Sequence, residues 1–203
     1  MKNIMNEKLS ISETEPMKAR FYDYERFTYP WHFHSEYEII YFEEGTGTRF
    51  VGNSIEPFIP GEVLLIGPNL AHYMKSDEYM PKGLKGTIIQ FEKDFMHYAV
   101  SNYSQFVKIK KLLEESRNGL VLSIISNDDL NTALNKIPTE KGINQIITLL
   151  EILKLMSETE SRKILSTSEP TEISVSDHPR FDKVLSFLNR NYNREIKLEE
   201  IAS

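Results

Sequence analysis

The chain has 203 residues, of which 40% are hydrophobic, and this length and composition suit one globular domain with additional helices. It contains no cysteine, which excludes disulfides, a thiol nucleophile and a thiolate zinc site, so any metal would need His, Asp or Glu ligands. A formal charge of −6 argues against nucleic-acid binding by the whole chain, because such binding draws on clustered Lys and Arg.

The amino-terminal sequence does not resemble a targeting segment. MKNIMNEKLSISETE alternates charged and polar residues and lacks the continuous apolar stretch of a signal peptide. No later apolar run is long enough to span a bilayer. We therefore expect a cytoplasmic protein that has no membrane partner.

Up to about residue 95 the sequence is typical of strands and turns. Short runs rich in Tyr, Phe, Ile and Val are broken by turn residues at 45–47, 52–53 and 60–61. The predicted strands are 19–28, 37–43, 47–51, 62–66 and 86–91. Many short strands at close spacing favour a barrel or sandwich over βαβ units.

After residue 95 the apolar period becomes helical. The run SQFVKIKKLLEESRNG, residues 104–119, predicts a first helix that Gly119 can end. A second helix is predicted from about Ser126 to Ile137, and a third is INQIITLLEILKLM, residues 143–156. The predicted fold class is therefore α+β, with an amino-terminal antiparallel β-barrel followed by an all-α segment.

The third predicted helix carries a wider apolar stripe than covering one surface requires. We expect this helix to form a homodimer, which buries the same patch on both copies. The expected interface residues are Ile143, Ile146, Leu149, Leu150, Ile152, Leu153 and Met156. The alternative is an ordinary central helix, packed between the barrel and the helix 104–117.

A linker is predicted over residues 157–179, SETESRKILSTSEPTEISVSDHP, which are rich in Ser, Thr and Glu and include two prolines. Beyond it, apolar residues from Phe181 to Leu188 recur at helical spacing. The sequence IKLEEIAS then begins another helix, which Ser203 interrupts.

Two stretches together resemble the AraC-type family of bacterial transcription regulators. HFHSEYEIIYFEEGTG, followed by IPGEVLLIGPNLAH, is similar to the two motifs of a cupin barrel. FDKVLSFLNRNYNREIKLEEIA is similar to the opening of the family's DNA-binding domain. The resemblance implies a cupin-like effector-binding barrel over 1–95, a helical dimerisation segment over 96–160, a linker over 161–179 and the start of a helix-turn-helix domain over 180–203. It also implies that DNA is bound only through a carboxy-terminal region beyond Ser203.

The first of these stretches raises the question of a metal site. His32 and His34 project from the same face of a strand, whereas Glu38 would lie about 13 Å from His34 along a straight strand. A turn at Ser35-Glu36 would bring Glu38 back, and His72 could add a fourth ligand for Zn, Fe, Mn or Ni. The segment that ends at His72 lacks the Gly of the second cupin motif and is one residue shorter. AraC-type sensors generally bind organic effectors without a metal, so we expect no metal and no cofactor.

The favoured hypothesis is a small-molecule pocket inside the barrel, suited to a sugar or an aromatic acid. The residues expected to contact the effector are Trp31, His32, His34, Glu38, Tyr41 and His72. The predicted function is the effector-sensing and dimerisation region of an AraC-type regulator, without enzymatic activity. The alternative is a metal-dependent cupin enzyme, a dioxygenase or isomerase, and a third possibility is an interaction module that dimerises without an effector.

Overall fold

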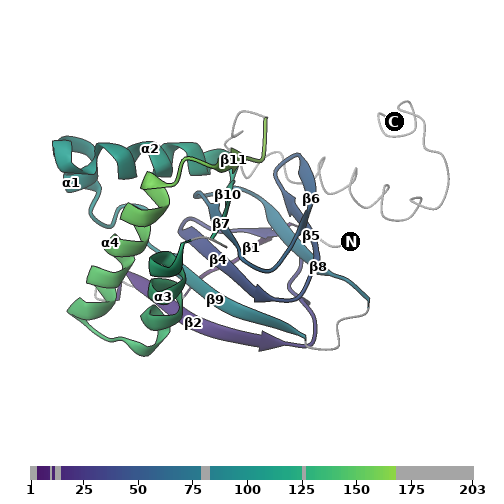
Figure 1. The fold of residues 1–203 in the computed structure, drawn as a ribbon. Coiled ribbons are helices and arrows are strands. Elements are labelled where there is room, and N and C mark those ends of the chain that lie inside the picture. The colour runs from purple at the N-terminus through teal and green to yellow at the C-terminus, as the bar shows by residue number, and fades with distance from the viewer. Residues whose placement is uncertain (1–3, 10, 12–14, 79–82, 125–126, 168–203) are drawn as a thin grey trace, which may run out of the picture.

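A computed structural model describes residues 4–9, 11, 15–78, 83–124 and 127–167 of the chain (Figure 1). The described strands are β1 (Met5–Asn6), β2 (Met17–Tyr24), β3 (His32–Phe33), β4 (Tyr37–Glu44), β5 (Gly47–Val51), β6 (Ser54–Phe58), β7 (Glu62–Ile66), β8 (His72–Ser76), β9 (Leu84–Phe91), β10 (Leu120–Ser123) and β11 (Arg162–Ile164). The described α-helices are α1 (His97–Asn102), α2 (Val107–Glu115), α3 (Asp128–Lys136) and α4 (Ile143–Glu158), and 3-10 turns cover Ser104–Phe106, Ser116–Asn118 and Ile137–Thr139. None of the described helices has the length and apolarity that a membrane span requires.

The strands form two separate sheets. One sheet has the order β1-β3-β8-β5-β6, and the other has the order β11-β10-β7-β4-β9-β2. The α+β class is confirmed, but the sheets are not closed into the barrel that the sequence predicted. Closure requires hydrogen bonds between every pair of neighbouring strands, and in the described structure β6 and β11 each end a sheet without pairing with the other.

The six-stranded sheet is the middle layer of the molecule (Figure 1). Helices cover one of its faces, and the five-stranded sheet covers the other. Its central strand β4, YEIIYFEE, is therefore an almost continuous apolar run. Side chains alternate along it, so that Ile39 and Tyr41 join the core under the helices while Ile40 and Phe42 join the core between the sheets.

Most of the long elements were predicted correctly. The ranges 47–51 and 62–66 coincide with β5 and β7, and 19–28, 37–43 and 86–91 correspond to β2, β4 and β9 with shifted ends. The three predicted helices are α2, α3 and α4. The later half is not purely helical, because β10 pairs with β7 and β11 pairs with β10. Both strands are too short for their periodicity to be read.

The predicted linker falls only partly within the described residues. Residues 157–158 end α4, and residues 162–164 extend the six-stranded sheet as β11. Residues 168–179 of the predicted linker and the predicted start of the helix-turn-helix domain at 180–203 lie outside the described residues.

Most of the apolar surface of α4 is buried against other elements of the same chain. Leu149, Ile152, Leu153 and Met156, four of the seven residues expected in a dimer interface, are buried in the core with α2, α3 and the sheet. Ile146 and Leu150 are half-buried, and Ile143 is exposed. The wide stripe therefore serves contacts with several neighbours in the same chain, as in the central-helix alternative.

We predict that two isoleucines of α4 respond differently to the same substitution. Ile152 has 0% exposure and Ile147 has 55%. In the monomeric chain, Ile152→Ala should lower the free energy of unfolding by about 2–5 kcal/mol, because it leaves a cavity in the core, whereas Ile147→Ala should change it by less than about 0.5 kcal/mol. Urea unfolding followed by circular dichroism measures both. Equal losses in the two variants would contradict this placement of α4.

Candidate functional site: a buried histidine cluster and a pocket at the open edge

Four of the six residues expected in the effector site lie together. His32 on β3 is directly paired with His72 on β8, in the five-stranded sheet. Glu38 lies on β4 in the facing sheet, and His34 lies in the connection between β3 and β4. All four are buried, and their potential ligand atoms lie within 4.8 Å of one another. The cluster thus joins the two sheets at one end of the space between them.

The chain reaches this arrangement through the bend that the sequence required. It bends at Ser35 and Glu36, so that β4 enters the second sheet and Glu38 returns to His34. Glu38 Oε2 lies 3.5 Å from His34 Nε2 and 3.1 Å from His72 Nε2. One carboxylate oxygen therefore faces two imidazoles.

The glycine missing from the second motif does not displace His72. Asn69 adopts a φ of 62°, a left-handed conformation that asparagine tolerates better than most residues. Its N–H donates to the carbonyl of His34 at 2.7 Å, which fixes the turn against the other half of the cluster. The turn is made without glycine, and His72 begins β8 beside His32.

A second layer of hydrogen bonds orients the cluster. Each imidazole has its Nδ1 beside a backbone carbonyl oxygen: His32 beside Pro30 at 2.8 Å, His34 beside Glu36 at 3.1 Å and His72 beside Leu70 at 2.8 Å. Gln90 on β9 donates from Nε2 to Glu38 Oε1 at 2.8 Å. Our sequence analysis missed Gln90, whose one signal is a polar residue within the buried strand TIIQF.

Burial and mutual charge shift the pKa values within the cluster. Burial and the neighbouring His72 lower the pKa of His32 to about 3. Burial acts against protonation of His34, but the adjoining Glu38 carboxylate outweighs it and raises the pKa of that imidazole. Burial alone would raise the pKa of Glu38, but the imidazoles of His34 and His72 hold it below its ordinary value. Glu38 is therefore ionised at neutral pH.

Trp31 and Tyr41, the other two expected residues, lie away from this cluster. Tyr41 is three residues along β4 from Glu38 and faces the helices, where its hydroxyl donates to Asn131 Oδ1 at 2.9 Å. Trp31 packs against Phe50 and Tyr73, which are paired across β5 and β8. That pair is next to the inward-facing pair of Val51 and His72, so Trp31 lies on the opposite face of the sheet.

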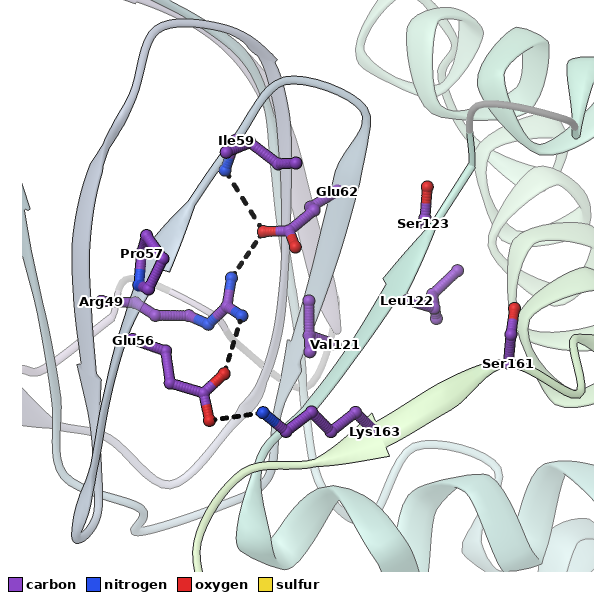
Figure 2. Close-up of a pocket in the computed structure, with 10 residues that line it drawn as sticks. All are labelled: Arg49, Glu56, Pro57, Ile59, Glu62, Val121, Leu122, Ser123, Ser161 and Lys163. Carbon is purple, nitrogen blue, oxygen red and sulfur yellow. Dashed lines mark hydrogen bonds and ion pairs between the residues drawn. The ribbon is translucent and has the colours of Figure 1, made fainter.

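A separate pocket of about 360 Å³ opens where β6 and β11 fail to close the barrel (Figure 2). Its walls come from β5 and β6 on one side and from β7, β10 and β11 on the other. The lining residues are Arg49, Glu56, Pro57, Ile59, Glu62, Val121, Leu122, Ser123, Ser161 and Lys163. None of the six residues expected to contact an effector is among them.

Charged groups hold this pocket together. The buried Arg49 guanidinium pairs with Glu62 at 2.5 Å and with Glu56 at 3.3 Å, and Lys163 pairs with Glu56 at 2.7 Å (Figure 2). Lys163 is the main cause that holds the pKa of Glu56 below its usual range. Glu62 also accepts a hydrogen bond from the backbone N–H of Ile59. Two cations and two carboxylates thus balance in charge at the mouth of the sandwich.

Residues 17–173 match the family described as AraC-like ligand binding domain. The chain belongs to this family. The match confirms the family resemblance of the barrel motifs, and it ends before the stretch that resembles a DNA-binding domain. No curated protein sequence matches the chain.

Solved structures of transcription regulators are among those to which the chain is similar. ToxT of Vibrio cholerae strain SCE256 with a bound unsaturated fatty acid has a TM-score of 0.50 and 14% identity, covering 97% of this chain and 69% of ToxT. ToxT of Vibrio cholerae O395 bound to (E)-4-(8-methylnaphthalen-1-yl)but-3-enoic acid has a TM-score of 0.48 and 14% identity, covering 92% and 70%. The AraC-like transcriptional activator CuxR has a TM-score of 0.39 and 12% identity, covering 82% and 55%. At 14% identity, the likeness to ToxT with the bound unsaturated fatty acid concerns the fold alone.

We predict that the two cations of the pocket contribute unequally to stability. Arg49→Met should lower the free energy of unfolding by about 3 kcal/mol, because Glu62 and Glu56 lose a buried partner. Lys163→Met should change it by at most about 1 kcal/mol, since the Lys163 side chain is mostly exposed. Chemical denaturation of both variants tests this, and an Arg49→Met protein as stable as the wild type would contradict the buried pairing.

Proposed function

We propose that the chain is the effector-sensing region of an AraC-type transcription regulator, and that a small organic acid binds in the pocket at the open edge. The observation that carries this proposal is which elements of the fold form the wall of the pocket. It joins both sheets to β11, the last described strand before the residues that resemble a DNA-binding domain. A bound effector would thus touch the part of the domain that leads onward along the chain.

Glu56 supports an acidic effector, because its carboxylate already occupies the position that a ligand carboxylate would take. It bridges Arg49 and Lys163, and its side chain is partly exposed at the rim. An incoming carboxylate can replace it at both cations while Glu56 turns into solvent. Bridging contacts of this kind are charge-assisted and favour carboxylates over neutral hydroxyls.

The remaining surface of the pocket suits the apolar part of such an acid. Pro57, Ile59, Val121 and Leu122 line it, and its volume falls in the range of small-ligand sites. An aromatic or aliphatic acid therefore fits better than a sugar. The ToxT structure with a TM-score of 0.50 holds an unsaturated fatty acid, which supports this class of effector.

Effector binding would act on the chain through β11. Arg162 of this strand pairs with Glu115 on α2 at 2.7 Å and donates to the carbonyls of Ser157 and Thr159, while Lys163 lines the pocket. A ligand that prefers one position of β11 shifts the population toward that position. We propose that this shift controls a DNA-binding region that begins near residue 180.

The second candidate function is a metal-dependent enzyme of the cupin kind. The histidine and glutamate cluster favours it, but all four side chains are buried. A substrate would reach them only after the surrounding structure opened. We therefore propose a regulator in the cytoplasm and not an enzyme.

We predict that acids bind and that Glu56 competes with them. Isothermal titration of the chain with trans-cinnamate, decanoate and L-arabinose should show binding of at least one acid, weakened by added salt. Glu56→Gln should tighten acid binding, because it removes the internal carboxylate. Lys163→Gln should weaken it about fivefold, the equivalent of ~1 kcal/mol.

The matched control for this titration is Lys154→Gln, which removes the same charge from an exposed position on α4 outside the pocket. It should leave the affinity unchanged. Binding of the sugar alone, or acid binding that Lys163→Gln and Glu56→Gln both leave unchanged, would refute the proposed effector site.

We also propose that the chain forms a homodimer through the exposed side of α4, where Ile143 and Ile147 have exposures of 67% and 55%. The double variant Ile143→Glu, Ile147→Glu should shift sedimentation from dimer to monomer without loss of helix content. A wild-type chain that sediments as a monomer at tens of micromolar, or a double variant that remains dimeric, would rule out this interface.

A further inference from the structure

The hydrogen bonds of the three histidines determine where their ring protons lie. A carbonyl oxygen can only accept a hydrogen bond, so the Nδ1 of each of the three histidines carries a proton and donates it. In the neutral imidazole, Nε2 then presents a lone pair. Glu38 Oε1 is taken by Gln90, which leaves Oε2 facing the Nε2 atoms. The Nε2 atoms of His34 and His72 therefore face Glu38 Oε2, and all four residues offer a ligand atom within 4.8 Å of the others.

Two nitrogen atoms of the cluster have no hydrogen-bond partner among the described residues. The Nε2 atoms of His34 and His72 are buried and make no hydrogen bond within the described part of the chain. A lone pair that faces a carboxylate at 3.1 or 3.5 Å is repelled by it unless a proton or a metal cation lies between them. The cluster is thus built to surround a positive charge.

The carboxylates around the cluster also indicate a bound positive charge. Glu7 lies 3.6 Å from His32 Nε2, and Glu36 lies 3.7 Å from His34 Nδ1, in addition to Glu38. Among the described residues, the ion pairs of these three carboxylates are all with histidines and none is with Lys or Arg. Three partly or fully buried carboxylates without a Lys or Arg partner in the described ranges require a counter-charge.

The spacing fits a metal ion. With bonds of 2.0–2.1 Å, two ligand atoms on a tetrahedron lie about 3.3 Å apart. The distances of 3.1 and 3.5 Å from Glu38 Oε2 to the two imidazoles lie on either side of this value. The ligand atoms of all four residues lie within 4.8 Å of one another, close enough to surround a single ion.

The hydrogen bonds around the cluster are those of a metal site. Metal-binding histidines almost always donate their other ring N–H to a carbonyl or carboxylate, and ligating carboxylates are themselves hydrogen-bonded. Here the carbonyls of Pro30, Glu36 and Leu70 hold the three rings, and Gln90 holds the carboxylate. A merely structural group of histidines does not require the same outward Nδ1 bond at every ring.

We infer that His32, His34, Glu38 and His72 bind one divalent transition-metal ion of the Mn to Zn range. Three imidazoles and one carboxylate suit these ions, and the absence of thiolate disfavours softer ones. The ion would join β3 and β8 of one sheet to β4 of the other. This inference does not depend on the proposed effector pocket, which shares no residue with the cluster.

The test measures metal content and coordination. The untagged chain is stripped with EDTA, equilibrated with a small excess of ZnSO₄ or CoCl₂, and passed through gel filtration. Mass spectrometry of the eluted protein should find one ion per chain. The cobalt form should show the visible absorption of a four- or five-coordinate ion, which is several times stronger than that of the hydrated ion.

Variants connect this ion to the named residues. His34→Gln combined with His72→Gln should abolish stoichiometric binding, whereas His97→Gln, which alters an exposed histidine on α1, should leave it unchanged. Gln90→Leu should retain one site but weaken zinc affinity about 10–100-fold in competition with a chromophoric chelator. Circular dichroism checks that each variant is folded.

Two results would overturn the inference. One is a wild-type chain that elutes without metal or gives only the spectrum of hydrated cobalt, which means that protons alone neutralise the cluster. The other is an ion that remains stoichiometric in the folded double variant, which places it elsewhere. If the double variant does not fold, the wild-type cobalt spectrum and the Gln90→Leu competition decide the question.

Discussion

The burial of the six-stranded sheet on both faces is the constraint on which the rest of the structure depends. Helices cover one face of this sheet and a second sheet covers the other. The side chains of β4 therefore point alternately into the core under the helices and the core between the sheets. Glu38 enters the space between the sheets, where Gln90 donates a hydrogen bond to one of its carboxylate oxygens and His34 and His72 face the other. Tyr41 lies three residues from Glu38 along β4, so its side chain points to the opposite face of the sheet and joins the core under the helices.

The sequence allowed the fold class and the long elements to be predicted, since runs such as EVLLI and SQFVKIKKLL show their period over several residues. It also placed His32, His34, Glu38 and His72 together, because a motif resemblance brings distant residues into one site. It could not show that the sheets stay open, because barrel closure depends on pairing between β6 and β11, which are far apart in the sequence. The pocket around Arg49 arises from that gap and was missed for the same reason.

Two other predictions depended on local details that a sequence pattern does not show. The stripe on α4 was read as a dimer surface, although Leu149 and Ile152 contact neighbours within the chain, because a helix pattern shows how wide an apolar surface is but not what covers it. The missing glycine of the second motif was taken as evidence against a metal site. Asn69 makes the same turn with a positive φ, an ability that a motif comparison does not register.

The account places two polar sites at separate ends of one sandwich, with Ile40, Phe42 and Leu64 packed in the core between the sheets. Its central claim, that the histidine cluster holds a metal and the open edge does not, is tested most directly by anomalous X-ray diffraction from crystals of the zinc-equilibrated chain. The account predicts one strong peak about 2.0–2.2 Å from Glu38 Oε2 and the three Nε2 atoms. A cluster without anomalous signal, filled by water or by an organic molecule, would contradict it.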